Sequence, residues 1–314
     1  MEAKKISKNI IKAIKDNALT FFICLMMIII SVGLVALMCW GVYTSLKTQI
    51  NWDDDPVGLP TGWPWDWAWS NLSTVFNRFV VKVDYTNAAG AIIASKVPVN
   101  IWYMLIYTLI YAGGGALVMS MTTCIMGYMT ARYPNKFSSI LTVVVITVMA
   151  LPVVGSSTSE LQIMIKLGLY NTLTGAIVQK FNFLGVYFLV FQAFFVGLSN
   201  EYAEAAEIDG ASQFRILWNI MIPMARNILF TVILLNFVGL WNDYNSPLLY
   251  FPSYPTLSYG LYYITSGPGA YETAISNPPM RLAASMILFV PILTIFIIFR
   301  NRIIGNVTMG GVKE

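Results

Sequence analysis

The chain has 314 residues, of which 57% are hydrophobic and only 11% are charged, and its formal net charge is +4. Soluble domains carry about 25% charged residues, so the composition excludes an ordinary soluble protein and predicts an all-α polytopic membrane protein. The sequence holds no histidine and no G-x-x-x-x-G-K-[ST] loop, which excludes imidazole metal sites, Ser-His-Asp triads and nucleotide hydrolysis by a P-loop of its own. We expect no catalytic residue, no metal site and no cofactor in this chain, and no binding to nucleic acid.

Six segments are apolar enough to cross a membrane as helices, since a span needs about 20 apolar residues. They cover residues 19–46, 101–129, 138–157, 176–198, 226–251 and 281–300. Six spans place both termini on one side, and most of the 19 basic residues fall there: five lysines before residue 18, Arg132, Lys136, Arg215, Arg226 and three near the C-terminus. Because loops rich in Lys and Arg stay in the cytoplasm, both termini are predicted to be cytoplasmic.

The segment before the first span, residues 1–18, repeats isoleucine every four residues from Ile6 to Ile14, with its lysines at other positions. This spacing predicts a short amphipathic helix on the cytoplasmic membrane surface, with a frayed basic tail as the alternative. The apolar run 19–46 exceeds the roughly 7–15 residues of a signal-peptide core, so we predict a retained first span.

The first outer loop, 47–100, is the longest connection and combines Asp53–Asp55 with tryptophans at positions 63, 65, 67 and 69. Three adjacent carboxylates could bind Ca²⁺, but no EF-hand spacing is present and a solvated charge run is the favoured interpretation. The tryptophans could stack on sugar rings, although anchoring at the membrane–water boundary is favoured. In the second span, Gly113–Gly115 predict close helix packing.

An acidic, alanine-rich stretch, Ser199–Pro223, lies between the fourth and fifth spans on the predicted cytoplasmic side. Ser199 or Asn200 is a suitable N-cap for a helix whose first turn holds Glu201 and Glu204, where the helix dipole favours acids. Such a helix would present small residues and carboxylates to a partner with a basic cleft.

Gly210 tolerates the left-handed conformation that ends a helix. A second helix is expected to begin near Ala211, and Pro223 is expected to bend the chain into the fifth span. From the residues alone, a docking surface and a plain solvated connection between spans both remain open.

The same stretch resembles the EAA motif of ABC-importer permeases, E-A-A-x₃-G-x₉-I-x-L-P. Glu204-Ala205-Ala206, Gly210 and Ile220-x-Ile222-Pro223 keep this spacing throughout, with Ile222 where the family usually has leucine. In that family the motif forms a coupling helix that docks in a groove of a cytoplasmic ATPase. The resemblance implies an ATPase contact made by the motif and its neighbour, namely Glu204, Ala205, Ala206, Asp209, Gly210 and Pro223.

Three further stretches resemble the carbohydrate-uptake subfamily, in particular the maltose-type second permease. "FVGLWNDYNSPLLY" from Phe237 resembles its W-N-x-[FY] segment, "RYPNKF" at Arg132 resembles its second cytoplasmic loop, and "NVTMGGVKE" resembles its T-x-G-[AG]-V-K tail. In subunits that share this tail, it reaches into the ATPase dimer interface. The implied contacts in the tail, 304–314, are Thr308, Gly310, Gly311, Val312 and Lys313. The outer loop 47–100 lies outside the resemblance.

The resemblance implies a transport subunit with a permease core, 101–303, in the cytoplasmic membrane of a bacterium. Its partners would be a second, non-identical permease, two P-loop ATPases that hold ATP and Mg²⁺, and an extracytoplasmic solute-binding protein. The substrate would be a carbohydrate of oligosaccharide size, with an amino acid or a peptide as the alternative within the same class.

Asp243 is a carboxylate within the fifth predicted span. Counting from Arg226 at about 1.5 Å per residue puts Trp241, Asn242 and Asp243 about 25 Å across the bilayer. We predict that these three residues line the pathway or its outer gate, with packing against the partner permease as the alternative. Because Asp243 is nearly alone, a secondary transporter or channel is disfavoured. A membrane-embedded enzyme is disfavoured by the lack of histidine and of paired intramembrane carboxylates.

Overall fold

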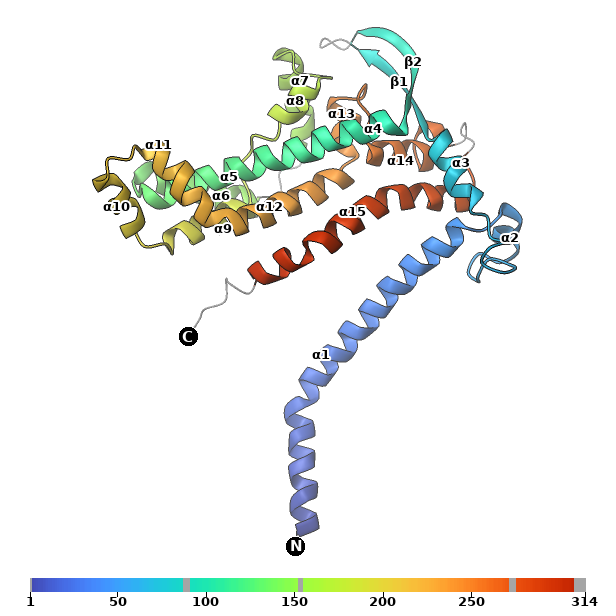
Figure 1. Ribbon diagram of the computed structural model, residues 1–314, viewed down its shortest axis with the longest axis horizontal. Helices are drawn as coiled ribbons and strands as arrows, with labels where there is room; N and C mark the ends of the chain where they lie inside the picture. The colour runs from blue at the N-terminus through green and yellow to red at the C-terminus, as the bar shows by residue number, and fades with distance from the viewer. Residues whose placement is uncertain (1, 87–90, 152–154, 271–274, 308–314) are drawn as a thin grey trace. The chain divides into compact units, whose positions relative to one another are not determined.

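The computed structural model describes residues 2–86, 91–151, 155–270 and 275–307, with side chains described for 20–86, 91–151, 155–269 and 275–299. These residues form helices and one β-hairpin (Figure 1). The α-helices are α1 (Glu2–Ser45), α2 (Gln49–Asp54), α3 (Ser70–Arg78), α4 (Ile101–Thr108), α5 (Gly115–Arg132), α6 (Lys136–Ala150), α7 (Ser156–Lys166), α8 (Leu173–Val178), α9 (Val186–Val196), α10 (Glu201–Ile208), α11 (Gln213–Ile216), α12 (Ile222–Asn242), α13 (Asn245–Tyr250), α14 (Leu257–Thr265) and α15 (Pro278–Val307). Two π-helical turns, Leu109–Gly114 and Leu217–Met221, and a 3₁₀ turn, Pro268–Ala270, complete the helical set, and the strands are β1 (Val80–Thr86) and β2 (Ile92–Asn100).

Within the described residues, four helical runs are long and apolar enough to cross a membrane: Thr20–Ser45, Ile101–Arg132, Gln213–Asn242 and Pro278–Phe299. Two shorter apolar helices, α6 and α9, have 15 and 11 residues. At about 1.5 Å per residue, neither α6 nor α9 alone covers the roughly 30 Å of a hydrocarbon core. Four runs therefore meet the criterion, and the count of six spans stays a prediction.

A proline and local hydrogen bonds explain why three expected spans differ from the observed helices. The third ends at Ala150, because Leu151 precedes Pro152 and adopts an extended backbone (φ −88°, ψ 126°). The fourth is interrupted between α8 and α9, where Asn182 Oδ1 accepts the backbone N–H of Leu184 at 2.8 Å. The fifth is interrupted after Asn242, where two residues separate α12 from α13 and Asp243 Oδ1 accepts the backbone N–H groups of Asn245 and Ser246.

The chain divides into two compact units, Met1–Val75 with Asn277–Met286 and Phe76–Ser276 with Ile287–Glu314. In the first unit, α1 is one continuous helix, so the expected surface helix 1–18 is not separated from the first span; its side chains lie outside the described set. The acidic run forms no metal cluster among the described residues. Instead, Asp55 accepts the backbone N–H groups of Gly58 and Val57, which lowers the pKa of its carboxyl.

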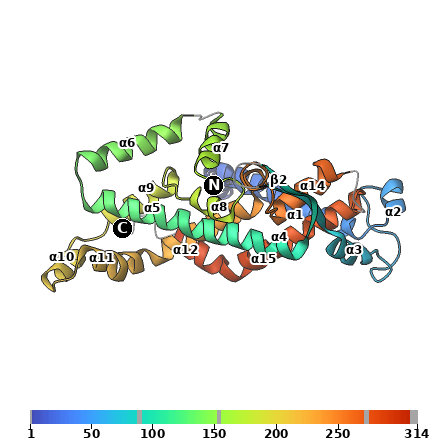
Figure 2. The ribbon, with the colours of Figure 1, turned by 90° about the horizontal axis from the view of Figure 1, so that it is seen from above.

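In the second unit, α5 packs against α9 and α12, as both ribbon views show (Figures 1 and 2). A Cβ added at Gly114 would lie 2.8 Å from Ile177 Cδ1, and one at Gly115 would lie 2.9 Å from Leu240 Cδ1. The expected close packing is therefore confirmed at Gly114 and Gly115. It is not found at Gly113, where a Cβ would have nothing within 4 Å.

The hairpin β1–β2 shows that the expectation of an all-α chain is wrong in the outer loop. The strands pair antiparallel from Val80↔Asn100 to Thr86↔Ile92, with register shifts around Tyr85. The physical reason is the alternation of β-branched residues in VVKVDYT, which buries Val81 and Val83 on one face. Asp84 Oδ1 accepts hydrogen bonds from the backbone N–H of Lys96 and from the Ser95 hydroxyl, both at 2.8 Å, and these bonds lower the pKa of the Asp84 carboxyl.

Candidate functional site

The Ser199–Pro223 stretch folds into α10, a tight turn and α11. Ser199 Oγ accepts the backbone N–H of Glu201 at 3.2 Å, so Ser199 rather than Asn200 supplies the hydrogen bond at the start of α10. Gly210 ends α10 with a φ of +77°, and the N–H of Ala211 donates to Ala206 O at 2.9 Å. The left-handed turn expected at Gly210 is therefore confirmed.

The second helix begins at Gln213, two residues later than expected. Ser212 is its N-cap and accepts the backbone N–H of Arg215 at 3.4 Å, which explains the later start. The helical path then continues through the π-helical turn Leu217–Met221 into α12, where Pro223 lies in the first turn. Pro223 has no N–H to donate to the preceding turn, and it follows this π-helical turn, where the N–H of Ile222 donates to Leu217 O. It lies inside one helical run, Gln213–Asn242, and does not separate two helices.

The alanines of α10 lie on opposite faces. Ala203 and Ala206 are buried, whereas Glu204 and Ala205 are exposed together with Asp209 and Gly210. The buried alanines join a core cluster with residues of α5, α9, α11 and α12, formed by Cys124, Tyr128, Phe191, Phe195, Ile216, Leu217, Met221, Ile222, Ala225, Leu229 and Val232. Small side chains at these two positions let α10 lie directly on that core.

Two apolar side chains, which sequence reasoning missed, project from the turn. Ile208 is 87% exposed at the end of α10, and Phe214 is 70% exposed in α11. Phe214 lies beside Trp218, with ring centroids 5.9 Å apart. The only signal in the sequence was the position of Ile208 and Phe214 on either side of Gly210. The exposed residues of this unit therefore include two large apolar side chains besides the carboxylates and small residues.

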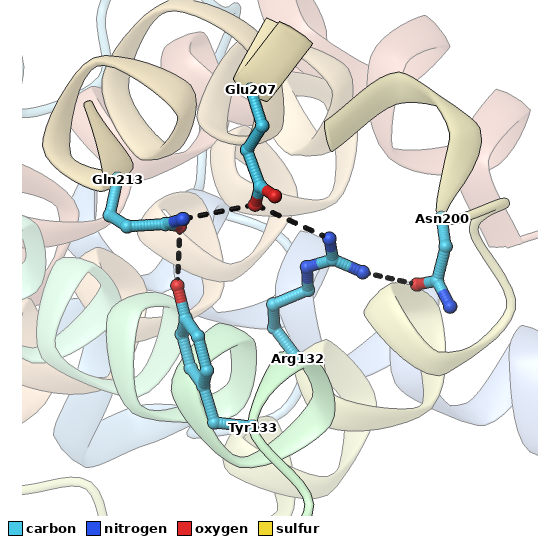
Figure 3. A network of polar contacts seen from close by, with 5 residues as sticks. All are labelled: Arg132, Tyr133, Asn200, Glu207 and Gln213. Carbon is cyan, nitrogen blue, oxygen red and sulfur yellow. Dashed lines mark hydrogen bonds and ion pairs between the residues drawn. The ribbon is translucent and has the colours of Figure 1, made fainter. Parts of the chain in front are cut away.

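A polar network ties α10 to the end of α5 (Figure 3). Arg132 Nη1 donates to Asn200 Oδ1 at 2.7 Å, and Arg132 Nη2 lies 3.6 Å from Glu207 Oε1. Gln213 Nε2 donates to the same Glu207 oxygen at 2.9 Å, and Tyr133 OH donates to Gln213 Oε1 at 2.5 Å. Arg132 thus contacts both ends of α10, a role that the RYPNKF resemblance did not assign.

The second candidate region lies at the C-terminal end of α12. Trp241 is buried, and Asn242 is exposed and donates from Nδ2 to Val238 O of its own helix at 2.9 Å; neither residue lines the polar cavity described below, and their place along a pathway stays a prediction. Asp243 follows the helix; its Oδ1 accepts the backbone N–H groups of Asn245 and Ser246 at 2.9 and 3.0 Å. Its Oδ2 accepts Tyr111 OH at 2.6 Å.

A polar cavity of about 360 Å³ lies next to this carboxylate, between α7, the turn after α8 and α13. Its polar lining includes Glu160, Gln179, Lys180, Asn182, Asn245 and Tyr250. Glu160 Oε1 accepts Gln179 Nε2 at 2.8 Å, and Glu160 Oε2 accepts Tyr250 OH at 2.9 Å. The sequence predicted no functional role for Glu160, Gln179 or Lys180, because their elements are adjacent only in the folded chain.

The tail residues expected to contact an ATPase, Thr308, Gly310, Gly311, Val312 and Lys313, lie outside the described residues. Within the described part, no group of three or more His, Cys, Asp or Glu side chains could hold a metal ion.

Comparisons with known proteins show which proteins this chain is similar to. The arabinooligosaccharides transport system permease protein AraQ of Halalkalibacterium halodurans is 32% identical over 60% of this chain and 65% of its own length. The diacetylchitobiose uptake system permease protein NgcG of Streptomyces coelicolor is 25% identical over 91% of this chain and 86% of its own. The maltose/maltodextrin transport system permease protein MalG of Yersinia pestis is 24% identical over 75% and 78%.

Among solved structures, the fold is similar to a chain of a bacterial ABC transporter involved in the import of the acidic polysaccharide alginate. The TM-score is 0.67 with 16% sequence identity, covering 91% of this chain and 97% of that one. The family model described as "Binding-protein-dependent transport system inner membrane component" matches residues 123–308, which include α10, α11 and every residue that lines the polar cavity except Met119. Since this match covers more than half of the chain, the protein belongs to the family of binding-protein-dependent transport system inner membrane components.

Proposed function

We propose that this chain is one of two permease subunits of an ATP-driven importer for a carbohydrate of oligosaccharide size. The observation that carries the proposal is α10, whose acidic outer face is exposed while its inner face is buried in the core of a transport-family fold. The relatives support the substrate class, because their names specify arabinooligosaccharides, diacetylchitobiose and maltodextrin as transported solutes.

The inner face of α10 suits the transmission of a force. Ala203 and Ala206 share one core cluster with the ends of α5, α9 and α12. Protein cores are close-packed, so a displacement of α10 moves these helix ends with it instead of being absorbed. The Arg132 network adds a second connection between α5 and α10.

The outer face suits a cytoplasmic ATPase with a basic groove. One hydrogen bond to a charged group is worth about 1.5–3 kcal/mol, and burying an isoleucine side chain is worth about as much. Glu204 supplies the charge and Ile208 supplies the apolar anchor, with Ala205 leaving room for close approach. The C-terminal tail would add a further contact.

In the proposed cycle, two ATPases bind ATP and Mg²⁺ and close, which pushes the coupling helices of the two permeases together and opens the pathway outward. An extracytoplasmic binding protein then delivers the sugar, and phosphate release reverses the movement. All covalent chemistry takes place in the ATPases, in a complex located in the bacterial cytoplasmic membrane.

Affinity purification from native membranes, followed by mass spectrometry, tests this proposal. We expect the wild-type chain to recover a second EAA-bearing permease and a P-loop ATPase, and Glu204→Lys to lose the ATPase. Asp54→Lys is the matched control, because it makes the same charge change at an exposed residue of the outer loop. Uptake of labelled arabinotriose, diacetylchitobiose and maltotriose by the same cells identifies the sugar.

If the wild-type chain purifies without an ATPase, the proposal is wrong. If Glu204→Lys retains the ATPase as fully as Asp54→Lys does, the coupling role of α10 is wrong.

A further inference from the structure

Helix α10 is short and depends on its surroundings for a fixed position. It has eight residues and lies between Ser199, which caps its start, and the turn at Gly210. An isolated helix of fewer than about 12–15 residues is marginal in water, so tertiary contacts must hold it. The side chains that α10 buries are those of Ala203 and Ala206, each with a single methyl group. Apolar contact is non-directional, so two methyl groups do little to stop α10 from turning about its axis or sliding along the core.

Directional contacts come from the end of α5, which is distant from α10 in sequence (Figure 3). Arg132 Nη1 donates to Asn200 Oδ1 at 2.7 Å, just before the first residue of α10. Arg132 Nη2 lies 3.6 Å from Glu207 Oε1, in the last turn of the same helix. A guanidinium holds its donors in a rigid, planar fork. One side chain therefore contacts α10 at both ends and opposes its rotation as well as its sliding.

The next residue of the chain extends the network across the turn at Gly210. Tyr133 OH donates to Gln213 Oε1 at 2.5 Å, and Gln213 Nε2 donates to Glu207 Oε1 at 2.9 Å. Arg132, Glu207, Gln213 and Tyr133 thus form a closed ring, because Arg132 and Tyr133 are consecutive in the chain. The end of α5 therefore holds α10 and α11 on both sides of the turn.

Folding stability does not account for this network. The side chains of Arg132 and Glu207 are 17% and 42% exposed, and an ion pair with such access to solvent contributes little to the stability of a fold. Within the described ranges, Glu204 makes no ion pair and no side-chain hydrogen bond, although it lies only three residues before Glu207 on α10. The two carboxylates therefore differ in role: Glu204 faces outward, and Glu207 is held by the end of α5.

We infer that Arg132 is a positioning residue of the transport cycle, which ties α10 to the end of the helical run Ile101–Arg132. This run is one of those long and apolar enough to cross a membrane. Along the chain, α10 is connected to α9 and α12 but not to α5. A displacement of α10 reaches the run through Asn200, Glu207 and Arg132. The inference rests on the proposed function and deepens it, because it separates docking on the ATPase from transmission of the movement to α5.

The test measures docking, ATP hydrolysis and uptake on the whole complex. In Arg132→Gln, we expect the ATPase to be recovered from membranes as with wild type and the purified complex to hydrolyse ATP, because Glu204 and Ala205 are unchanged. Uptake by cells of labelled arabinotriose, diacetylchitobiose or maltotriose should fall about tenfold, the effect of losing roughly one hydrogen bond to a charged group. Arg215→Gln is the matched control, since it makes the same change at an exposed arginine of α11 outside the network.

A charge exchange distinguishes the loss of this ion pair from a general loss of structure. Arg132→Glu and Glu207→Arg should each remove most of the uptake, and the double variant should recover most of it. The amides of Asn200 and Gln213 can donate or accept, so they can accommodate the reversed charges. The mismatched exchange, Arg215→Glu with Glu207→Arg, should stay as low as Glu207→Arg alone.

The inference is overturned if Arg132→Gln cells take up sugar as fast as Arg215→Gln cells, or if the charge exchange recovers no uptake. It is also overturned if recovery of the ATPase falls in proportion to uptake, because Arg132 would then act in docking. If the wild-type chain recovers no ATPase or supports uptake of none of these sugars, the proposed function itself fails.

Discussion

Gly210 occupies a backbone conformation that other residues adopt only with strain. Its φ of +77° reverses the chain between α10 and α11, and a Cβ at this position would meet nothing within 4 Å. The requirement for glycine is therefore conformational rather than steric. The sequence predicted this turn because glycine after an alanine-rich helix is a common stop signal.

Replacing Gly210 by alanine should destabilise the turn by about 1–2 kcal/mol, the usual cost of the left-handed conformation for an L-residue. The turn would then open roughly 5–30 times more often. Arg215 is exposed in α11, so limited trypsin digestion at this residue measures the opening. We expect faster cleavage in Gly210→Ala, a smaller increase in Gly210→Asn, and no increase in Gly239→Ala, which changes an exposed helical glycine with φ outside the left-handed region. Equal rates in all variants would contradict this account.

At the scale of elements, helix α5 packs closely on its neighbours at the positions where it has a glycine in the contact. A Cβ at Gly127 would lie 2.7 Å from Phe191 Cβ and 3.0 Å from the backbone N of Gln192. The backbone of α5 therefore lies directly against Phe191 and the backbone of α9 at this point. The sequence pattern drew attention to Gly113–Gly115, yet Gly127 is the position where a Cβ meets backbone of a neighbouring helix. Only the helix crossing decides which glycine is in contact.

Gly127→Ala should therefore disrupt the packing of α5 on α9, at a cost of about 1–3 kcal/mol from overpacking. Gly113→Ala is the matched control, because a methyl group there meets nothing within 4 Å. The thermal midpoint of the detergent-purified protein, followed by tryptophan fluorescence, should fall for Gly127→Ala and stay close to wild type for Gly113→Ala. The account is wrong if the two variants have the same midpoint.

The breaks in the expected spans also belong to this scale. Apolar composition identified the segments around α6, α9 and α12, but the ends of these helices depend on single residues. Pro152 follows the end of α6, and Asn182 Oδ1 accepts the backbone N–H of Leu184 just before α9. A hydropathy average over about 20 residues does not detect a side chain that captures one backbone N–H. The interruptions at Phe181–Gly185 and after Asn242 therefore did not follow from the pattern.

For the whole molecule, the distribution of Lys and Arg predicts which loops face the cytoplasm. We expect Glu204→Cys and Lys136→Cys to be labelled by a membrane-impermeant maleimide only after cells are permeabilised. Asp54→Cys and Lys166→Cys should be labelled in intact cells, in a background where Cys24, Cys39 and Cys124 are replaced by alanine. All four positions are exposed in the folded chain, so accessibility reports the side of the membrane.

Lys166→Cys is the decisive position for the number of spans. If α6 and α9 belong to membrane crossings, Lys166 lies outside while Lys136 lies inside. If the cysteines of Lys136→Cys and Lys166→Cys are labelled from the same side, the segment between them does not cross the membrane, and the count of six spans is wrong.

The sequence by itself determined the membrane class, the position of the helix–turn–helix at Ser199–Pro223 and the family resemblance, because these depend on composition and on local spacing along the chain. The tertiary structure decided that Ala206 faces the core while Ala205 faces outward, that Arg132 contacts both ends of α10, and that Gln179, Lys180 and Glu160 share one cavity. Sequence spacing fixes neighbours only within an element, whereas contacts between distant elements depend on how the helices cross.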